Sequence, residues 1–545
     1  MYHQVQQNNI KSAEPINLNY INPQFNFPHS ISDEDIKAED ENQSLEPEQI
    51  QHKEILKVLL NEIKPIDFIA LINPIANELQ QEYQRIVNAY EEDNKELHTA
   101  LNIPKEGKES SRILEIQSKL QAITKGIKQK HYVVCIITEL LKIAETSNWN
   151  LCKCYDYVYI YNGAFWKQLS KEDLKYFLGE AAIKFSYPVI EAVHHLFKDE
   201  LLKQFVTQAH LPTPECDQDK ILINLQNGTF EFIGSKWQLR SFNPKDFMTY
   251  QLPFRYDPNV TCPKFDNYLK KVLPDEDSRK ILQEFSGFIF TKLNLEKCLV
   301  LTGGGSNGKS VFFNILIALI GKENTLTYSM GLFNHEYNRA KLTNVLLNYS
   351  SEKGTDLNVE TFKALISGEP LQAREPYGKS FTINNKVKFI MNCNELPKET
   401  ESTEAYFRRY IIIPFDVKIP ESERDINLAS DIIKKELPGV FNWLLKGLER
   451  LISQQKFTNS QKVDLALAAF KKQSDNIALF IDEYSYKPST NLKKSLIDLY
   501  VQYKQFCADD GYKAYGKNRF SAILESKGFE STRLNDGSKG FFISI

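Results

Sequence analysis

The residues best suited to chemistry form the glycine-rich stretch LVLTGGGSNGKSVFFNIL at 299–316, which matches the pattern G-x-x-x-x-G-K-[ST]. Glycines let backbone N–H groups turn inward around phosphate oxygens, and the N-terminus of a following helix adds its dipole to that anion site. Lys309 is expected to be solvated in the empty site and to reach the β- and γ-phosphates, while the Ser310 hydroxyl ligates Mg²⁺. The stretch therefore predicts an ATP and Mg²⁺ site at Gly303, Gly304, Gly305, Ser306, Asn307, Gly308, Lys309 and Ser310.

A single carboxylate, Glu352, follows the apolar residues of VLLNYSSEKG at 345–354. A P-loop ATPase needs a second strand beside the first, with an acid near Mg²⁺ and the attacking water, so Glu352 is the candidate base and Mg²⁺ contact. Ser351 stands where such strands usually carry Asp, which puts direct acidic metal ligation in doubt but not nucleotide binding. The alternative for Glu352 alone is a solvated strand end.

Polar residues also follow or precede two further apolar strands. KVKFIMNCNELP at 386–397 ends in Asn394, whose amide could sense the γ-phosphate and position water because it both donates and accepts hydrogen bonds. EAYFRRYIIIPF at 404–415 places Arg408 and Arg409 before a strand, where either could be an arginine finger inserted into a neighbour's site. The alternatives are an Asn in a strand-end turn and two surface charges.

Between these strands the sequence predicts a helix over 360–367 and a hairpin that turns near 376–379. Tyr377 and Lys379 at the turn are suited to base stacking and phosphate contact with single-stranded nucleic acid. On these residues alone, an ordinary exposed hairpin explains the pattern equally well.

The elements that must position these residues form an α/β segment, because apolar strands alternate with helices over 261–475. It is flanked by four other zones. These are an acidic, Gln- and Asn-rich tail expected to be disordered (1–48), a helical region (49–130), an α+β module with turns at Asn162-Gly163 and Asn227-Gly228 (131–260), and a terminal module (476–545).

The terminal module is predicted to contain three helices, the third near 519–526, and then two short strands around 535–537. Such a unit can present a recognition helix and a wing to duplex DNA, with Lys517 and Arg519 as candidate contacts. The alternative is a small helical cap with solvated lysines. Between 513 and 539 the module has a surplus of three positive charges, from Lys513, Lys517, Arg519, Lys527, Arg533 and Lys539 against Glu525, Glu530 and Asp536.

Composition limits which kinds of protein and binding site remain possible. The chain has 545 residues, too many for one core, and a net charge of −3, so any nucleic-acid surface must be local. Eight cysteines without a CxxC pair predict free buried thiols in a reducing compartment and no zinc site. The absence of a signal-like start and of a long apolar run predicts a soluble, cytoplasmic protein.

The order of the motifs resembles the superfamily 3 helicases, an AAA+ branch found in viruses, phages and plasmids. The matching stretches are GGGSNGKS, LLNYSSEKG, ISGEPLQAREPYGKSF, KFIMNCNELP and FRRYIIIPF. The closer likeness is to the poxvirus-, phage- and plasmid-type primase–helicases, whose acid-tipped strand often carries only the glutamate. The resemblance covers about 150–545 and includes the winged-helix-like end. It does not cover 1–130, where no zinc-binding or acid-rich metal motif supports primer synthesis.

This resemblance implies an ATP-driven, hexameric DNA helicase in the replication of a phage, plasmid or other mobile element. Lys309, Ser310, Glu352 and Asn394 of one subunit and Arg408 or Arg409 of the next would form each ATP site. Single-stranded and forked DNA, further copies of the chain, and a separate primase or other replication proteins are the implied partners. The alternatives are a DNA-assembled P-loop ATPase that acts as an initiator or loader without unwinding, and a P-loop kinase of a small metabolite.

Overall fold

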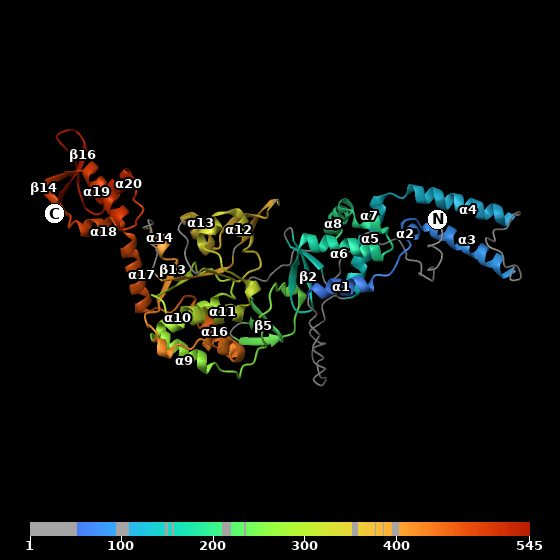
Figure 1. Cartoon of the computed structure of the whole chain (residues 1–545), viewed down its shortest axis with the longest axis horizontal. Coiled ribbons are helices and arrows are strands. Elements are labelled where there is room, and N and C mark those ends of the chain that lie inside the picture. The colour runs from blue at the N-terminus through green and yellow to red at the C-terminus, as the bar shows by residue number, and fades with distance from the viewer. Residues whose placement is uncertain are drawn as a thin grey trace. The chain divides into compact units, whose positions relative to one another are not determined.

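The computed structural model divides the chain into two units, Met1–Glu215 and Cys216–Ile545. This boundary falls inside the region 131–260 that the sequence suggested as one module. Figure 1 shows both units and labels many of their helices and strands. The structure describes residues 52–93, 108–147, 151–154, 157–209, 220–233, 236–350, 358–376, 378–384, 386–394 and 403–545.

The first unit packs helices around a small antiparallel sheet of order β1-β2-β3. Its core includes Ile136 and Leu140, which lie four residues apart on one helix, together with Phe177 and Phe197 from two others. Gly163, at φ +90°, makes the predicted turn between β2 and β3. The elements are α1 (His52–Glu62), α2 (Phe68–Ile72), α3 (Pro74–Asp93), α4 (Lys108–Gly126), α5 (Gln129–Thr146), β1 (Leu151–Cys154), β2 (Tyr157–Tyr161), β3 (Trp166–Leu169), α6 (Lys171–Lys184), α7 (Val189–Val193) and α8 (His195–Gln208).

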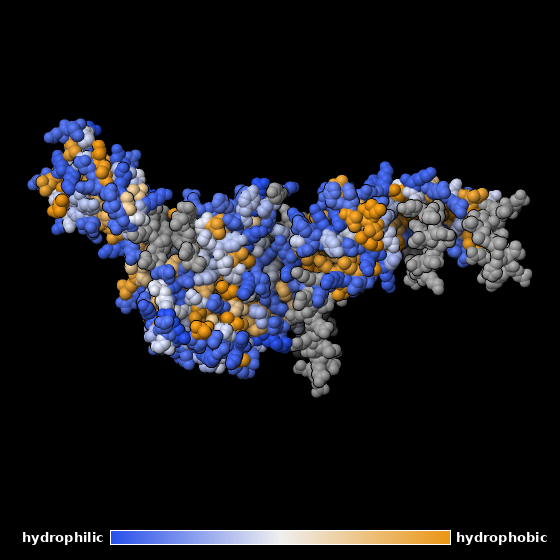
Figure 2. Space-filling view, in the orientation of Figure 1, coloured by the Kyte–Doolittle hydropathy of each residue, from blue (hydrophilic) through white to orange (hydrophobic). Residues whose placement is uncertain are grey.

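Apolar side chains are exposed on the first unit along α7 and at the start of α8. Ile190 is 83% exposed, and Val189, Val193 and Leu196 are each more than half exposed. Figure 2 shows hydrophobic surface over this part of the unit.

A five-stranded sheet of order β13-β7-β12-β9-β8, with every neighbouring pair parallel, forms the centre of the second unit. Its strands alternate between two cores: Leu299 and Ile413 face one, whereas Val300 and Ile412 face the other. The strands are β7 (Cys298–Thr302), β8 (Thr325–Leu326), β9 (Leu347–Ser350), β12 (Lys388–Cys393) and β13 (Tyr410–Pro414).

Helices and two smaller sheets complete this α/β core. The first core cluster takes in residues of α9, α10, α11 and α16 and of the antiparallel sheet β4-β5-β6, and the second takes in residues of α13 and α17. The elements are β4 (Ile221–Leu225), β5 (Gly228–Ile233), β6 (Lys236–Arg240), α9 (Pro263–Val272), α10 (Glu276–Phe288), α11 (Lys309–Ile320), α12 (Glu336–Ala340), α13 (Val359–Ser367), β10 (Pro370–Arg374), β11 (Ser380–Asn384), α14 (Glu404–Phe407), α15 (Leu428–Lys435), α16 (Leu437–Gln454) and α17 (Gln461–Ser474).

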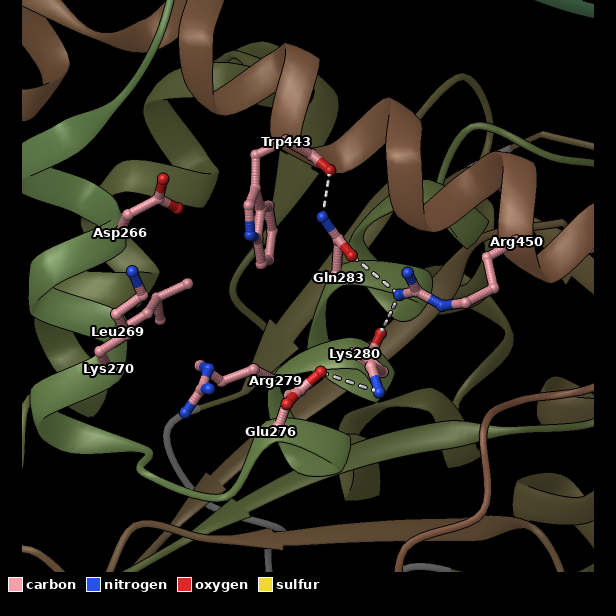
Figure 3. Close-up of a pocket in the computed structure, with 9 residues that line it drawn as sticks. All are labelled: Asp266, Leu269, Lys270, Glu276, Arg279, Lys280, Gln283, Trp443 and Arg450. Atoms are coloured by element: carbon pink, nitrogen blue, oxygen red, sulfur yellow. Dashed lines mark hydrogen bonds and ion pairs between the residues drawn. The ribbon is translucent and has the colours of Figure 1, made fainter.

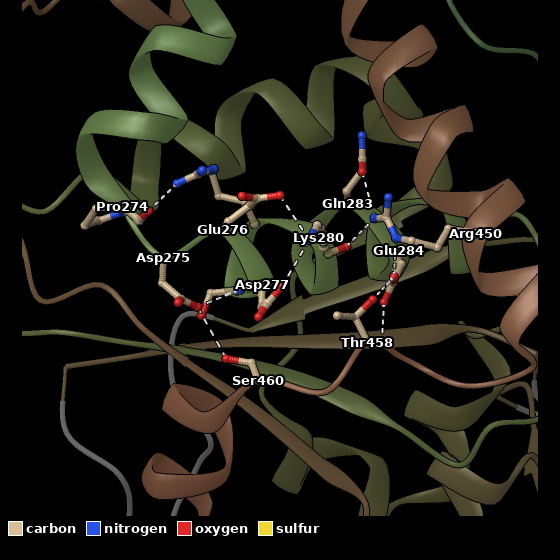
Figure 4. A network of polar contacts seen from close by, with 12 residues as sticks. Pro274, Asp275, Glu276, Asp277, Lys280, Gln283, Glu284, Arg450, Thr458 and Ser460 are labelled. Carbon is tan, nitrogen blue, oxygen red and sulfur yellow. Dashed lines mark hydrogen bonds and ion pairs between the residues drawn. The ribbon is translucent and has the colours of Figure 1, made fainter.

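A buried ion pair fixes α10 to α16. The Glu284 side chain is fully buried and accepts hydrogen bonds from Arg450 Nε at 2.5 Å, and from the Thr458 amide at 2.8 Å and its hydroxyl at 2.5 Å (Figure 4). A buried carboxylate is costly without partners, so these contacts hold α10 and α16 in one arrangement relative to each other.

The C-terminal residues have a core of their own, built around Phe480, Tyr503, Phe520 and Phe541. The order of elements is helix, strand, helix, helix, strand, strand, and the sheet β14-β16-β15 is antiparallel. The three helices and the two last strands were predicted. β14 was missed because KPSTNLKKS has no apolar alternation. The elements are α18 (Asn476–Glu483), β14 (Lys487–Ser495), α19 (Leu496–Asp509), α20 (Lys517–Ser526), β15 (Ser531–Arg533) and β16 (Lys539–Ser544).

Two findings bear on the expectations from composition. No helix within the described ranges is long and apolar enough to cross a membrane. The described cysteines whose state is defined are free thiols, as expected: Cys135, Cys262, Cys298, Cys393 and Cys507.

Candidate functional site: a glycine-rich loop at the edge of a parallel sheet

The glycine-rich stretch folds as the sequence predicts, into a strand, a tight loop and a helix. β7 ends at Thr302 and α11 begins at Lys309. Gly303, Gly305 and Gly308 have φ angles of +150°, +80° and +87°. A Cβ atom on Gly303 would lie 2.2 Å from Asn307 Nδ2 and 2.4 Å from the Phe415 carbonyl oxygen, so this position requires glycine.

The Lys309 side chain is buried, not solvated as the sequence analysis expected. Only 4% of the residue is exposed, and its ammonium donates to the Gly303 carbonyl and, at 3.0 Å, to Asn307 Oδ1. Burial lowers the pKa of this ammonium. Two neutral oxygen atoms of the loop therefore accept hydrogen bonds from the lysine. A bound anion would interact with the ammonium more strongly than these neutral acceptors do. Ser310, one residue further, is exposed.

Three contacts that sequence reasoning missed fix the shape of the loop. Asn307 Nδ2 donates to the Phe415 carbonyl at 3.0 Å. The Tyr268 hydroxyl donates to the Gly308 carbonyl at 2.7 Å, and the Ile419 amide donates to the Ser306 carbonyl at 2.8 Å. They come from α9 and from the chain after β13, segments far from the loop in sequence, so no local pattern could have indicated them.

Parallel strands bring their carboxyl ends to one edge of the sheet, and the candidate polar residues lie along this edge. The Gly303 amide donates to the Cys393 carbonyl at 3.3 Å, which places Asn394 next to the start of the loop. Asn394 is exposed. β9 ends at Ser350, two residues before Glu352, and Glu352 itself lies outside the described residues. The expectation that β9 lies directly beside β7 was wrong, because β12 lies between the two strands.

Two buried polar atoms near this edge have no hydrogen-bond partner among the described residues. They are Asn392 Oδ1 and Ser350 Oγ. Asn392 Nδ2 donates to the Tyr349 hydroxyl at 2.9 Å, which orients the amide. Buried acceptors without partners are costly, and they mark places where water, an ion or a ligand group completes the site. The glycine loop, the buried lysine and these oxygen atoms fit a nucleotide with Mg²⁺, whose preferred ligands are oxygens.

The two arginines differ, and they lie at the other edge of the sheet. Arg409 is 6% exposed and donates to Ser367 Oγ at 2.7 Å. Arg408 has a side chain that is 57% exposed and contacts Glu296 at 2.8 Å. The Cys298 amide, at the start of β7, donates to the Arg409 carbonyl at 2.8 Å. The geometry therefore favours Arg408 for contact with another molecule and gives Arg409 a packing role.

The predicted hairpin forms from β10 and β11, which pair from Pro370↔Asn384 to Arg374↔Ser380. Lys379 is exposed at its turn, whereas Tyr377 lies outside the described residues. Arg339 Nε donates to the Gln372 carbonyl at 2.6 Å and so attaches the hairpin to α12.

In the C-terminal module, α20 buries Phe520 and Leu524 and exposes Lys517 and Arg519. The Arg519 guanidinium lies 4.4 Å from the centre of the Tyr515 ring. Two of the six cations counted in the sequence are paired: Lys527 contacts Asp475 and Lys539 contacts Glu525, each at 2.6 Å. The exposed start of α20 is therefore the part of the module best placed for a phosphate contact.

A cavity of about 290 Å³ between α9, α10 and α16 is lined mainly by charged residues (Figure 3). Three of its four cations are engaged: Arg450 contacts Glu284, Lys280 contacts Glu276, and Arg279 Nη1 donates to the Leu273 carbonyl, whereas Lys270 is exposed. No residue of the P-loop lines this cavity. Its polar groups support the packing of the three helices.

Comparison with known families gives two partial matches. Residues 136–274 match the family described as D5 N terminal like. Residues 301–409, which contain the glycine-rich loop and both arginines, match a family of unknown function, DUF5906.

Curated relatives are viral proteins at low identity. The chain is 24% identical over 332 residues to "Putative helicase 121R" of Invertebrate iridescent virus 3, which covers 53% of the chain and 35% of that protein. It is 23% identical over 361 residues to "Putative helicase L207/L206" of Acanthamoeba polyphaga mimivirus, covering 60% and 37%. The chain thus spans about a third of the length of these two relatives.

Among solved structures, the C-terminal region of NrS-1 in its apo form is similar to 74% of the chain and to 98% of that structure, at 13% identity and a TM-score of 0.43. Residues 136–274 therefore resemble D5 N-terminal-like domains, and the chain is similar over part of its length to viral proteins named putative helicases.

Proposed function

We propose that the chain is an ATP-dependent DNA helicase subunit with an AAA+ core of superfamily 3, which acts in replication of a phage, plasmid or other mobile element. The observation that carries the proposal is the P-loop at the carboxyl edge of a parallel sheet, with the exposed Arg408 at the opposite edge. The helicase names of the viral relatives support the choice of activity.

At each site, the backbone amides of 303–308 and the start of α11 would surround the phosphates, and Lys309 would leave the Gly303 carbonyl to bind them. Ser310 and Glu352 are the proposed holders of Mg²⁺, which neutralises charge on the phosphates. Glu352 would accept a proton from the attacking water, and Asn394 would orient that water. The unpartnered Asn392 Oδ1 lies on the same strand and supports a polar site at this edge.

The site would be completed by a second copy. A subunit cannot bring its own Arg408 to its own P-loop without unfolding the sheet, because β13 and β7 run parallel in register from Tyr410↔Cys298 to Pro414↔Thr302. A closed ring, proposed as a hexamer, would give every P-loop a neighbour's arginine.

DNA would be held at two places with different roles. The hairpin turn, with Tyr377 and Lys379, is suited to single strands in a central pore. The C-terminal module has the order of elements of a winged helix, with α20 as the recognition helix and β15–β16 as the wing, and it is suited to duplex DNA through Lys517 and Arg519.

The exposed cations of α20 also favour a second candidate, a DNA-assembled ATPase that acts as an initiator or loader without strand separation. A forked duplex with one labelled strand distinguishes the two. The helicase proposal predicts ATP-dependent release of the labelled strand by the parental chain and none by Lys309→Ala. Stimulation of ATP turnover by DNA without strand release would support the loader instead.

A further inference from the structure

A second cavity in the core, of about 170 Å³, lies at the amino edge of the parallel sheet. Four of its lining residues are lysines, and no Asp or Glu is among its described lining residues. They come from two stretches: Lys292 and Lys297 precede β7, whereas Lys386 and Lys388 lie at the start of β12. Four ammonium groups around one cavity repel one another, and a bound anion would relieve that repulsion.

Lys388 is the buried member of this group. It is 8% exposed, and its ammonium donates to the Leu293 carbonyl at 3.0 Å and lies 3.9 Å from the centre of the Phe288 ring. Burial, with a smaller contribution from Lys386, lowers the pKa of Lys388 to about 7. Burial also lowers the pKa of Lys297, whose ammonium donates to the Arg408 carbonyl. The nearest acid along the chain, Glu296, is already engaged by Arg408.

The place of the cavity in the fold indicates which anion it would take. Gly368, which lines the cavity, stands two residues before β10, and Lys386 stands two residues after β11. The cavity therefore lies at the base of the hairpin whose turn exposes Lys379. Each strand of the hairpin has five residues, so base and turn are about 17 Å apart at ~3.4 Å per residue.

We propose that this lysine cavity binds a backbone phosphate of single-stranded nucleic acid, as a second contact at the base of the β10–β11 hairpin. The proposal rests on the proposed function in one respect, because it assumes that the hairpin contacts single-stranded nucleic acid. Lys388 and Lys297 would bind the phosphate from within, and the exposed Lys292 and Lys386 would bind it from the rim. Bound phosphate would favour the charged form of Lys388 and would raise its pKa above about 7.

This linkage fixes the sign of a pH effect. Binding is fully assisted while Lys388 is already charged, below pH about 7, and weakens as pH rises through the pKa of the free protein, because a proton must then be taken up. Lys386, on the β11–β12 connection, lowers the pKa of Lys388 and so strengthens this dependence, and Lys292 and Lys297 line the same cavity from the segment before β7. The charged groups that act on Lys297 are Arg408, Glu296 and Asp464.

The test is binding of a fluorescent oligo-dT to the full chain without ATP, measured across a salt series at pH 6.5 and pH 8.5. The variants are Lys388→Met, which removes the ammonium but keeps most of the length of the side chain, and the rim variant Lys386→Ala, which leaves the core intact. Lys446→Ala, at an exposed position on α16, is the matched control for loss of one positive charge. Lys388→Met should bind roughly tenfold more weakly at pH 6.5, the scale of one charge-assisted contact. Its salt slope should fall by about 0.7, the value for one single-strand phosphate.

The parental affinity should also fall more steeply with pH than that of Lys388→Met. Equal affinity, salt slope and pH dependence in the parental chain and both lysine variants would overturn the proposal. The proposal would also be overturned if Lys388→Met bound the oligo-dT with unchanged affinity but tripolyphosphate no longer competed with it. The occupant of the cavity would then be a nucleotide polyphosphate. If the parental chain fails to unwind DNA but Lys388→Met still shows the predicted loss of oligo-dT binding, the helicase proposal is refuted and this phosphate site stands.

Discussion

Arg408 and Lys309 lie at opposite edges of one parallel sheet, although their strands are direct neighbours. Arg408 precedes β13, Lys309 follows the loop after β7, and the two strands pair in parallel register over five residues. At ~3.3 Å per residue the sheet alone separates the two edges by about 17 Å. Under the proposed function, this separation means that Arg408 could complete only the nucleotide site of another copy.

The buried Lys309 gives a first prediction. Lys309→Ala should abolish ATP turnover, because no other side chain in the loop can bring a positive charge to the β- and γ-phosphates. It also removes hydrogen bonds to Gly303 and Asn307, so we expect a modest loss of stability of about 1–2 kcal/mol. Steady-state ATPase and thermal melting measure the two effects. Lys322→Ala, an exposed lysine beyond α11, is the control and should change neither. Parental turnover in Lys309→Ala would show that the site is wrongly assigned.

Glu352→Gln should separate binding from hydrolysis. The amide keeps the size of the side chain but cannot accept the proton of the attacking water, so turnover should fall on the order of hundreds-fold while ATP still binds. A fluorescent ATP analogue measures affinity in the same preparations. Loss of binding in Glu352→Gln would instead indicate a structural role for this residue.

The buried pair Glu284–Arg450 should be important for stability rather than activity. Arg450→Ala leaves a fully buried carboxylate with only the contacts from Thr458, so we expect a loss of about 3–5 kcal/mol in the free energy of unfolding of the α/β core. Arg424→Ala is the matched control, because this arginine is exposed and its change should cost less than about 0.5 kcal/mol. Urea denaturation followed by tryptophan fluorescence compares the three chains. Equal midpoints for Arg450→Ala and the parental chain would contradict this account.

Duplex and single-strand contacts should be separable. Deleting 476–545 leaves α17, which packs in the core through Phe470, and should weaken duplex binding and flatten its salt dependence, since fewer counterions are released. The double change Lys517→Ala with Arg519→Ala should reproduce much of this effect in the intact chain. Lys379→Ala should leave duplex binding near the parental value and lower the stimulation of ATPase by single strands. An unchanged salt slope in the truncated chain would support the helical-cap interpretation.

The sequence predicted those structural features that are marked by residues close together in the chain. The strand–loop–helix at 298–320, the hairpin at 370–384 and the last three helices were predicted because glycines, turns and apolar periodicity mark them directly. The position of β12 between β7 and β9, the contact of Tyr268 with Gly308 and the burial of Lys309 were not predicted. They depend on pairings between segments distant in sequence, which no local pattern encodes. The choice between Arg408 and Arg409 likewise required the neighbours of each side chain.

The central claim, a site shared between copies, is tested most directly by mixing two inactive variants. Arg408→Ala and Lys309→Ala chains should each lack ATPase, and their mixed rings should recover part of it, because some interfaces then combine an intact P-loop with an intact arginine. Arg409→Ala replaces the arginine that packs against Ser367, so its main effect should be lower stability. The measurement is ATP turnover across mixing ratios, with mixed assembly confirmed by two different tags. The account predicts a maximum at intermediate ratios, and no recovery at any ratio would contradict it.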